Sequence, residues 1–112
     1  MTDCEFGDVV LIPFPFTDQT TAKKRPAVVV SSAAYQSSHP DLVLMAITSR
    51  IKPSPAFGEV TVEHWEMAGL IKPSVTKPIF TTLEKSLTSR KMGKLHVEDQ
   101  QRLKMTIQKI LG

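Results

Sequence analysis

The chain has 112 residues, of which 41% are hydrophobic and 22% charged, and its formal net charge is +3. This length and composition predict one globular domain over residues 1–112, and the positive charge mildly favours a polyanionic partner. No apolar run approaches the roughly 20 residues of a membrane span, so no membrane association is expected. The one cysteine, Cys4, excludes an internal disulfide and a cysteine-based zinc site, and it is typical of the reducing cytoplasm.

The first half of the chain predicts three strands joined by polar loops. Residues 9–14 form an apolar run that Pro15 closes, because proline cannot donate to a strand ladder. Residues 27–32 are a continuous β-branched run, typical of a central strand buried on both faces. Residues 42–48 form the third strand, and we expect the polar segment 33–41 to be a loop.

The second half begins with shorter elements. Residues 59–62 alternate polar and apolar side chains, as a half-exposed strand does. Residues 64–69 predict a short helical turn that ends at glycine. Residues 75–83 predict a further strand, whereas residues 87–95 have a mixed pattern that assigns no element.

The last segment predicts the one clear helix, residues 97–111. Its apolar side chains, Leu103, Ile107, Ile110 and Leu111, fall on one helical face. Several short strands and a terminal helix indicate a mainly β (α+β) fold, a small partly open barrel on which that helix packs. A parallel βαβ arrangement is not expected, because no long helix separates the first three strands.

Three consecutive cations, Lys23-Lys24-Arg25, end the first polar loop. Arg25 offers a planar guanidinium that can grip a phosphate through two hydrogen bonds. Pro26 fixes the backbone beside it, so Arg25 leaves the strand in a defined direction. These residues form a candidate phosphate-binding site; the alternative is a solvated charge run.

A second polar cluster, Thr48-Ser49-Arg50, ends the third apolar run. Hydroxyl groups at the end of a buried strand stand at the rim of a barrel, where loops often bind or catalyse. The alternative is a Ser/Thr turn that only terminates the strand.

The sequence predicts no metal site and no cofactor. His39, His64 and His96 lie far apart in the sequence and have no metal-ligand spacing, and no glycine-rich phosphate loop is present. Metal-free cleavage is open to RNA, because its 2′-OH is a built-in nucleophile. The protein then needs only to orient that hydroxyl and stabilise the charged phosphorane. DNA lacks the 2′-OH.

Several short motifs occur together along the chain. Gly7-Asp8 opens the first strand, Arg25-Pro26-Ala27 the second, and Thr48-Ser49 follows the third. With Ala68-Gly69-Leu70-Ile71-Lys72-Pro73-Ser74 and residues 91–95, the motifs span almost the whole chain. In this combination the chain resembles the MazF/PemK family of type II toxin–antitoxin endoribonucleases, the mRNA interferases.

The resemblance implies an SH3-like barrel of the MazF/PemK/CcdB kind that works as a homodimer and is inhibited by a cognate antitoxin protein. It implies cleavage of single-stranded RNA to 2′,3′-cyclic phosphate and 5′-OH ends. By motif, Arg25 matches the active-site arginine, which we assign to stabilising transition-state charge, with proton transfer as an open second role. A base role is disfavoured because a guanidinium stays protonated in proteins. Thr48 matches the hydroxyl residue that binds the scissile phosphate or positions the 2′-OH, with Ser49 as a helper.

The residues expected to contact RNA lie in the two polar segments and are Phe16, Thr17, Asp18, Gln19, Lys23, Lys24, Ser49, Arg50 and Lys52. The cations would contact backbone phosphates. Phe16 or Phe57 would stack on a base, although packing within the protein is the alternative for both. Residues 18–22 lack the glutamate that some members of the family have there, and Arg50 stands where many members have glutamine. The RNA sequence that other members cut is therefore not assigned to this chain.

Two other functional classes stay open at this point. One is a toxin of the same barrel fold that binds DNA gyrase and cuts no RNA. The other is an RNA- or DNA-binding module without catalysis.

Overall fold

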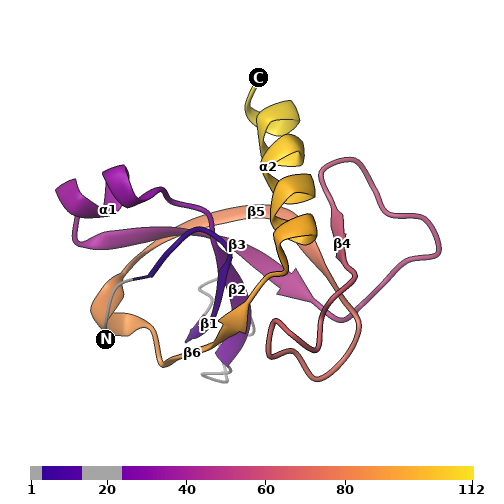
Figure 1. Ribbon diagram of the computed structural model, residues 1–112, viewed down its shortest axis with the longest axis horizontal. Helices are drawn as coiled ribbons and strands as arrows, with labels where there is room; N and C mark the ends of the chain where they lie inside the picture. The colour runs from indigo at the N-terminus through magenta and orange to yellow at the C-terminus, as the bar shows by residue number, and fades with distance from the viewer. Residues whose placement is uncertain (1–3, 14–23) are drawn as a thin grey trace.

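The computed structural model describes residues 4–13 and 24–112, and its strands form one antiparallel sheet that curls into an open half-barrel (Figure 1). The strands are β1 (Asp8–Pro13), β2 (Lys24–Val29), β3 (Asp41–Thr48), β4 (Val60–Val62), β5 (Ser74–Glu84) and β6 (Arg90–Lys94). Their order is β4-β5-β3-β2-β1-β6, so β4 and β6 are the two edges. With helix α2 (Val97–Leu111) at the end of the chain, this confirms the predicted partly open barrel.

The predicted strands are present, and β2 departs most from its expected bounds. It begins at Lys24 and ends at Val29, whereas the apolar run predicted residues 27–32. The early start has a tertiary cause, because Lys24 pairs with Pro13 and Arg25 pairs with Ile12 of β1. Strand pairing thus extends β2 into the charged segment, where local composition favours a loop.

The predicted loop at residues 33–41 was wrong, because it holds a helix, α1 (Ala33–Ser38). Ser32 is its N-cap, and the Ser32 hydroxyl accepts a hydrogen bond from the Tyr35 N–H over 3.1 Å. Gln36 is buried, and its Nε2 donates to the Ser31 carbonyl over 3.1 Å. The cap and this buried amide stabilise a helix that has no apolar periodicity.

The segment between β4 and β5 contains the predicted helical turn. The Leu70 N–H donates to the Trp65 carbonyl over 3.1 Å, and Gly69 has a φ of +81°. This is the left-handed ending typical of a helix that terminates at glycine. Further on, the unassigned segment 87–95 contains the end of a 3-10 turn, η1 (Lys85–Leu87), and the edge strand β6.

The two faces of the sheet bury separate apolar clusters. Val9 and Val28 belong to the cluster beneath α2, whereas Val10 and Val29 belong to the cluster on the opposite face. Alternate side chains of β1 and β2 are therefore buried on opposite faces, which confirms that β2 is a central strand.

Helix α2 covers the first of these clusters through only part of its predicted apolar face. Leu103 is fully buried, and Ile107 and Ile110 pack beside it. Leu111 was wrongly predicted on this face, because its side chain is 70% exposed at the last helical residue.

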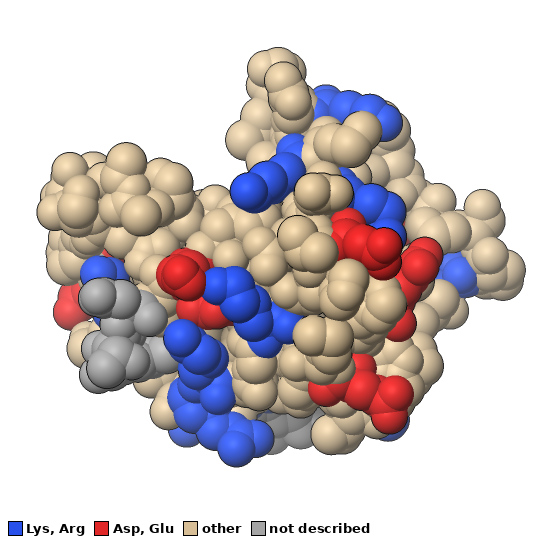
Figure 2. Space-filling model, in the orientation of Figure 1, with Lys and Arg blue, Asp and Glu red and all other residues tan. Residues whose placement is uncertain are grey.

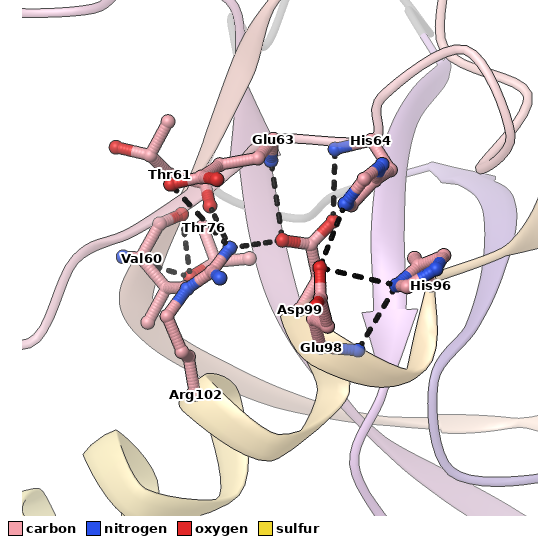
Figure 3. Close-up of polar contacts among 9 residues, drawn as sticks. All are labelled: Val60, Thr61, Glu63, His64, Thr76, His96, Glu98, Asp99 and Arg102. Carbon is pink, nitrogen blue, oxygen red and sulfur yellow. Dashed lines mark hydrogen bonds and ion pairs between the residues drawn. The ribbon is translucent and has the colours of Figure 1, made fainter.

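A buried carboxylate joins α2 to the turn after β4 (Figure 3). Asp99 is 1% exposed and accepts hydrogen bonds from the backbone N–H groups of Glu63 over 3.2 Å and His64 over 3.0 Å. Arg102 donates to Asp99 and to the Thr61 carbonyl. These contacts fix the start of the segment between β4 and β5, whose far end lines the cleft described next.

Candidate functional site

The strand register brings Arg25 and Thr48 to the same end of the sheet. Ala27 of β2 pairs with Ala46 of β3, so Arg25, two residues before Ala27, and Thr48, two residues after Ala46, lie towards the same end of this antiparallel pair. The two residues singled out from the sequence both line one cleft at this end.

The cleft has a volume of about 380 Å³ and lies where β1, β2, β3 and β6 end. Its lining residues are Leu11, Arg25, Pro26, Ile47, Thr48, Ser49, Arg50, Leu70, Ile71, Lys72, Ser74, Arg90 and Met92. The lining thus combines six apolar side chains with four cationic and three hydroxyl side chains. Such a lining suits a ligand with both charged groups and flat apolar faces.

Arg90 reaches this cleft through strand pairing across β6, β1 and β2. It pairs with Leu11, and Leu11 pairs with Pro26, so the three residues form one row across the sheet. Arg90 and Arg25 therefore approach the cleft from different strands. Both arginines line the cleft, which thus offers two guanidinium groups to an anionic ligand.

The cations of the cleft have no acidic partner among the residues that the structure describes. Within residues 4–13 and 24–112, no ion pair involves Arg25, Arg50, Lys72 or Arg90, and no carboxylate lines the cleft. Uncompensated positive charge in a concave site favours an anionic ligand.

Two lysines of β6, outside the cleft, are paired with carboxylates. On the face shown in Figure 2, Lys and Arg side chains gather over β6 with carboxylates beside them. Lys91 lies 3.2 Å from Asp8, and Lys94 lies 2.8 Å from Glu5. The hydrogen bond to Glu5 is the main cause that raises the pKa of Lys94 above its usual value. The carboxylates offset the positive charge of these two lysines. The cations of the cleft therefore attract an external anion more strongly than these lysines do.

The hydroxyl groups of the cleft retain capacity for a ligand. The Thr48 hydroxyl oxygen accepts a hydrogen bond from the Arg50 N–H over 3.1 Å, so its own proton is available to donate. The Ser74 hydroxyl donates to the Lys72 carbonyl over 3.0 Å and still has acceptor capacity. Thr48 is half-buried and held by this turn, which fixes the direction of its side chain.

Of the predicted site residues, the structure brings Arg25, Thr48, Ser49 and Arg50 together in the cleft. Lys24 and Lys52 are exposed and lie outside its lining, as does Phe57, whose side chain is 77% exposed. Five others lie outside the described residues: Phe16, Thr17, Asp18, Gln19 and Lys23.

Sequence reasoning missed three polar residues of the cleft. Lys72 and Ser74 flank Pro73 just before β5, within a segment whose motif carries the family resemblance, and that motif was a usable signal. Arg90 lies in the segment with no clear pattern, and only its pairing with β1 brings it to the cleft.

The family of the chain is decided by a comparison with family models. The model described as "PemK-like, MazF-like toxin of type II toxin-antitoxin system" matches residues 5–111. The chain belongs to this family of toxins. The comparison with curated protein sequences finds no match. Within the described part of the chain, no helix combines the length and apolar character needed to span a membrane.

Solved structures of MazF-like toxins share this fold. An "Endoribonuclease in complex with its cognate antitoxin from Mycobacterial species" superposes with a TM-score of 0.78 at 15% identity, covering 98% of this chain and 96% of that one. MazF in the MazE-MazF crystal structure from Deinococcus radiodurans gives 0.74 at 24% identity, with 97% and 96% covered. The Mycobacterium tuberculosis toxin MazF-mt6 gives 0.73 at 18% identity, with 93% and 95% covered.

Proposed function

We propose that this toxin is a metal-independent endoribonuclease that cleaves single-stranded RNA in the cleft between Arg25, Thr48 and Arg90. The observation that carries the proposal is the gathering of four cationic and three hydroxyl side chains beside apolar ones, with no carboxylate in the described lining. Phosphates match the cations, and bases match the apolar surface. Carboxylates are the ligands on which a Mg²⁺-dependent nuclease relies, so this lining favours a reaction without the ion.

The reaction uses the substrate's own nucleophile. The 2′-oxygen of one nucleotide attacks the adjacent phosphorus and loses its proton, while the 5′-oxygen of the next nucleotide leaves and gains one. The products are a 2′,3′-cyclic phosphate and a 5′-OH. No histidine or carboxylate belongs to the described lining of the cleft, so we assign both proton transfers to water.

Arg25 and Thr48 have different roles in this scheme. The Arg25 guanidinium stabilises the negative charge that grows on the phosphate oxygens in the transition state. The Arg50 N–H donates to the Thr48 hydroxyl oxygen, which leaves the hydroxyl proton for the substrate. This hydroxyl donates to the phosphate and holds it in line with the 2′-OH. Ser49 assists at the same rim.

The remaining cations bind the RNA backbone on either side of the scissile bond. We assign Arg50, Lys72 and Arg90 to this role from their place in the cleft, and Lys24 and Lys52 to more distant phosphates. Binding should then weaken steeply with salt, since each phosphate contact releases counterions.

We further propose that the toxin acts in the cytoplasm as a homodimer and is neutralised by an antitoxin. Large apolar side chains such as Phe57, Met67 and Ile71 are exposed, and they are suited to protein contacts. The cations of the cleft suit an acidic antitoxin segment that competes with RNA. Light scattering at micromolar concentration tests the dimer, and a monomer mass would contradict it.

Incubation of single-stranded RNA with the purified toxin in excess chelator tests the nuclease. We expect cleavage by the wild type and a loss of about a hundredfold or more in Arg25→Ala, the usual effect of removing one transition-state donor. Arg25→Lys keeps the charge but loses the two-pronged geometry, so it should restore little activity. Lys109→Ala, on the last turn of α2 and outside the cleft, is the control and should cut at the wild-type rate.

The same experiment separates the other functional classes. Intact RNA together with inhibition of DNA gyrase would identify a gyrase-binding toxin. Binding of RNA or DNA without cleavage would identify a binding module. Either result would overturn the proposed nuclease.

A further inference from the structure

Two histidines that are distant in the sequence meet beside a glutamate at the start of α2 (Figure 3). The rings of His64 and His96 stack with centroids 4.0 Å apart and planes 27° apart. Glu98 Oε1 lies 3.1 Å from His64 Nε2 and 3.8 Å from His96 Nδ1. The fold thus brings together two histidines whose positions in the sequence show no metal-ligand spacing.

The distances within this group are close to those of a metal site. One ligand atom from each of the three side chains lies within 4.8 Å of the others. A tetrahedral Zn²⁺ ion with ligands at about 2.0–2.1 Å holds them about 3.3 Å apart. The three side chains are thus within reach of one ion, and the two stacked rings turn so that their nitrogen lone pairs converge on it.

The backbone beneath the ligands is held in place from both elements. The His64 N–H donates to the buried carboxylate of Asp99, and His96 is the N-cap residue of α2. A site whose supports are fixed loses less entropy when the ion binds. His96 Nδ1 also accepts a hydrogen bond from the Glu98 N–H over 3.1 Å, so an ion at that nitrogen replaces this cap bond.

We propose that His64, His96 and Glu98 bind one divalent transition-metal ion per chain, Zn²⁺ above all. Two imidazoles and a carboxylate are ligands typical of zinc, whereas Mg²⁺ and Ca²⁺ prefer all-oxygen sites. Solvent reaches all three side chains, so water completes the coordination. None of the three residues lines the cleft, so the ion has no part in the proposed RNA chemistry. It ties the turn after β4 to α2.

Calorimetric titration of the chelator-treated full-length protein with ZnCl₂ tests the site. We expect one Zn²⁺ per chain, with affinity at least about tenfold weaker in His64→Ala and in Glu98→Gln. His96→Asn removes the imidazole but keeps a good N-cap residue, so its fold is preserved while zinc affinity falls in the same way. The control is His39→Ala, because this third histidine stacks on Tyr35 outside the group and its loss should leave zinc affinity unchanged.

Thermal unfolding gives a second readout that is independent of RNA cleavage. At free Zn²⁺ about a hundredfold above the dissociation constant, Tm of the wild type should rise by roughly 10 °C, and Tm of His96→Asn much less. MgCl₂ should leave Tm unchanged. The proposal is overturned if the wild type binds no Zn²⁺, if the three ligand variants bind it as tightly as the wild type, or if His39→Ala weakens binding equally.

Discussion

Two neighbouring carboxylates in the first turn of α2 should contribute very differently to stability. Asp99 is buried and accepts hydrogen bonds from the N–H groups of Glu63 and His64. Hydrogen bonds to charged groups contribute about 1.5–3 kcal/mol each. The Arg102 side chain is 40% exposed, so water can solvate it once Asp99 is removed, and we take the lower end of this range. Asp99→Ala should therefore cost about 3 kcal/mol.

Glu98→Ala is the matched control, because its side chain is 64% exposed and meets only the two histidines. Exposed ion pairs contribute about 0.2–1 kcal/mol. Urea unfolding followed by circular dichroism, in chelator, compares the two variants. With a denaturant slope of about 2 kcal/mol/M, Asp99→Ala should lower the midpoint by about 1.5 M and Glu98→Ala by less than about 0.5 M. Equal shifts would refute the role given to the buried carboxylate.

Three further predictions test the fold, its response to acid and the cleft. Gly69→Ala should lower Tm by roughly 10 °C, since the residue has a φ of +81° and a Cβ there would lie 2.2 Å from the Met92 carbonyl oxygen. Gly112→Ala, whose Cβ meets nothing within 4 Å, is the control, and equal losses would contradict the packing argument. The hydrogen bond from the Ala56 N–H is the main cause that lowers the pKa of the Glu59 carboxyl in the folded protein below its usual 4.5. The Glu59 carboxylate therefore stabilises the fold above pH 4.5, and this stabilisation is lost as the pH falls through the lowered pKa. In Glu59→Gln, the urea midpoint should accordingly depend less on pH between about pH 5 and pH 3 than it does in the wild type. An unchanged pH dependence would disprove this. Arg90→Ala should weaken single-stranded RNA binding and reduce its log–log salt slope by about 0.7, measured by fluorescence anisotropy, whereas an unchanged slope would remove Arg90 from the backbone contacts.

Most strands were predictable because their signal is local. The apolar runs of β3 and β5 and the periodicity of α2 lie within short segments, and the structure has these elements within one residue of their predicted bounds. Helix α1 was missed because its stability comes from the Ser32 cap and the buried Gln36, which leave no apolar pattern.

The candidate site was predictable in part for a related reason. Arg25 stands near the start of β2 and Thr48 at the end of β3, and the family resemblance assigned both to one active site. Arg90 reaches the cleft through the non-local pairing of β6 with β1, and His64 meets His96 because Asp99 joins α2 to the turn after β4. Neither juxtaposition has a counterpart in sequence spacing. The catalytic roles of Arg25 and Thr48 stay predictions.

The central claim is that the cleft cleaves RNA by attack of the 2′-OH. Its most direct test is to map the ends produced from a long single-stranded RNA, with excess chelator, by the wild type and by Arg25→Ala. We predict 2′,3′-cyclic phosphate and 5′-OH ends from the wild type and intact RNA from the variant. Uncut RNA, 5′-phosphate ends, or wild-type cutting by Arg25→Ala would contradict the account.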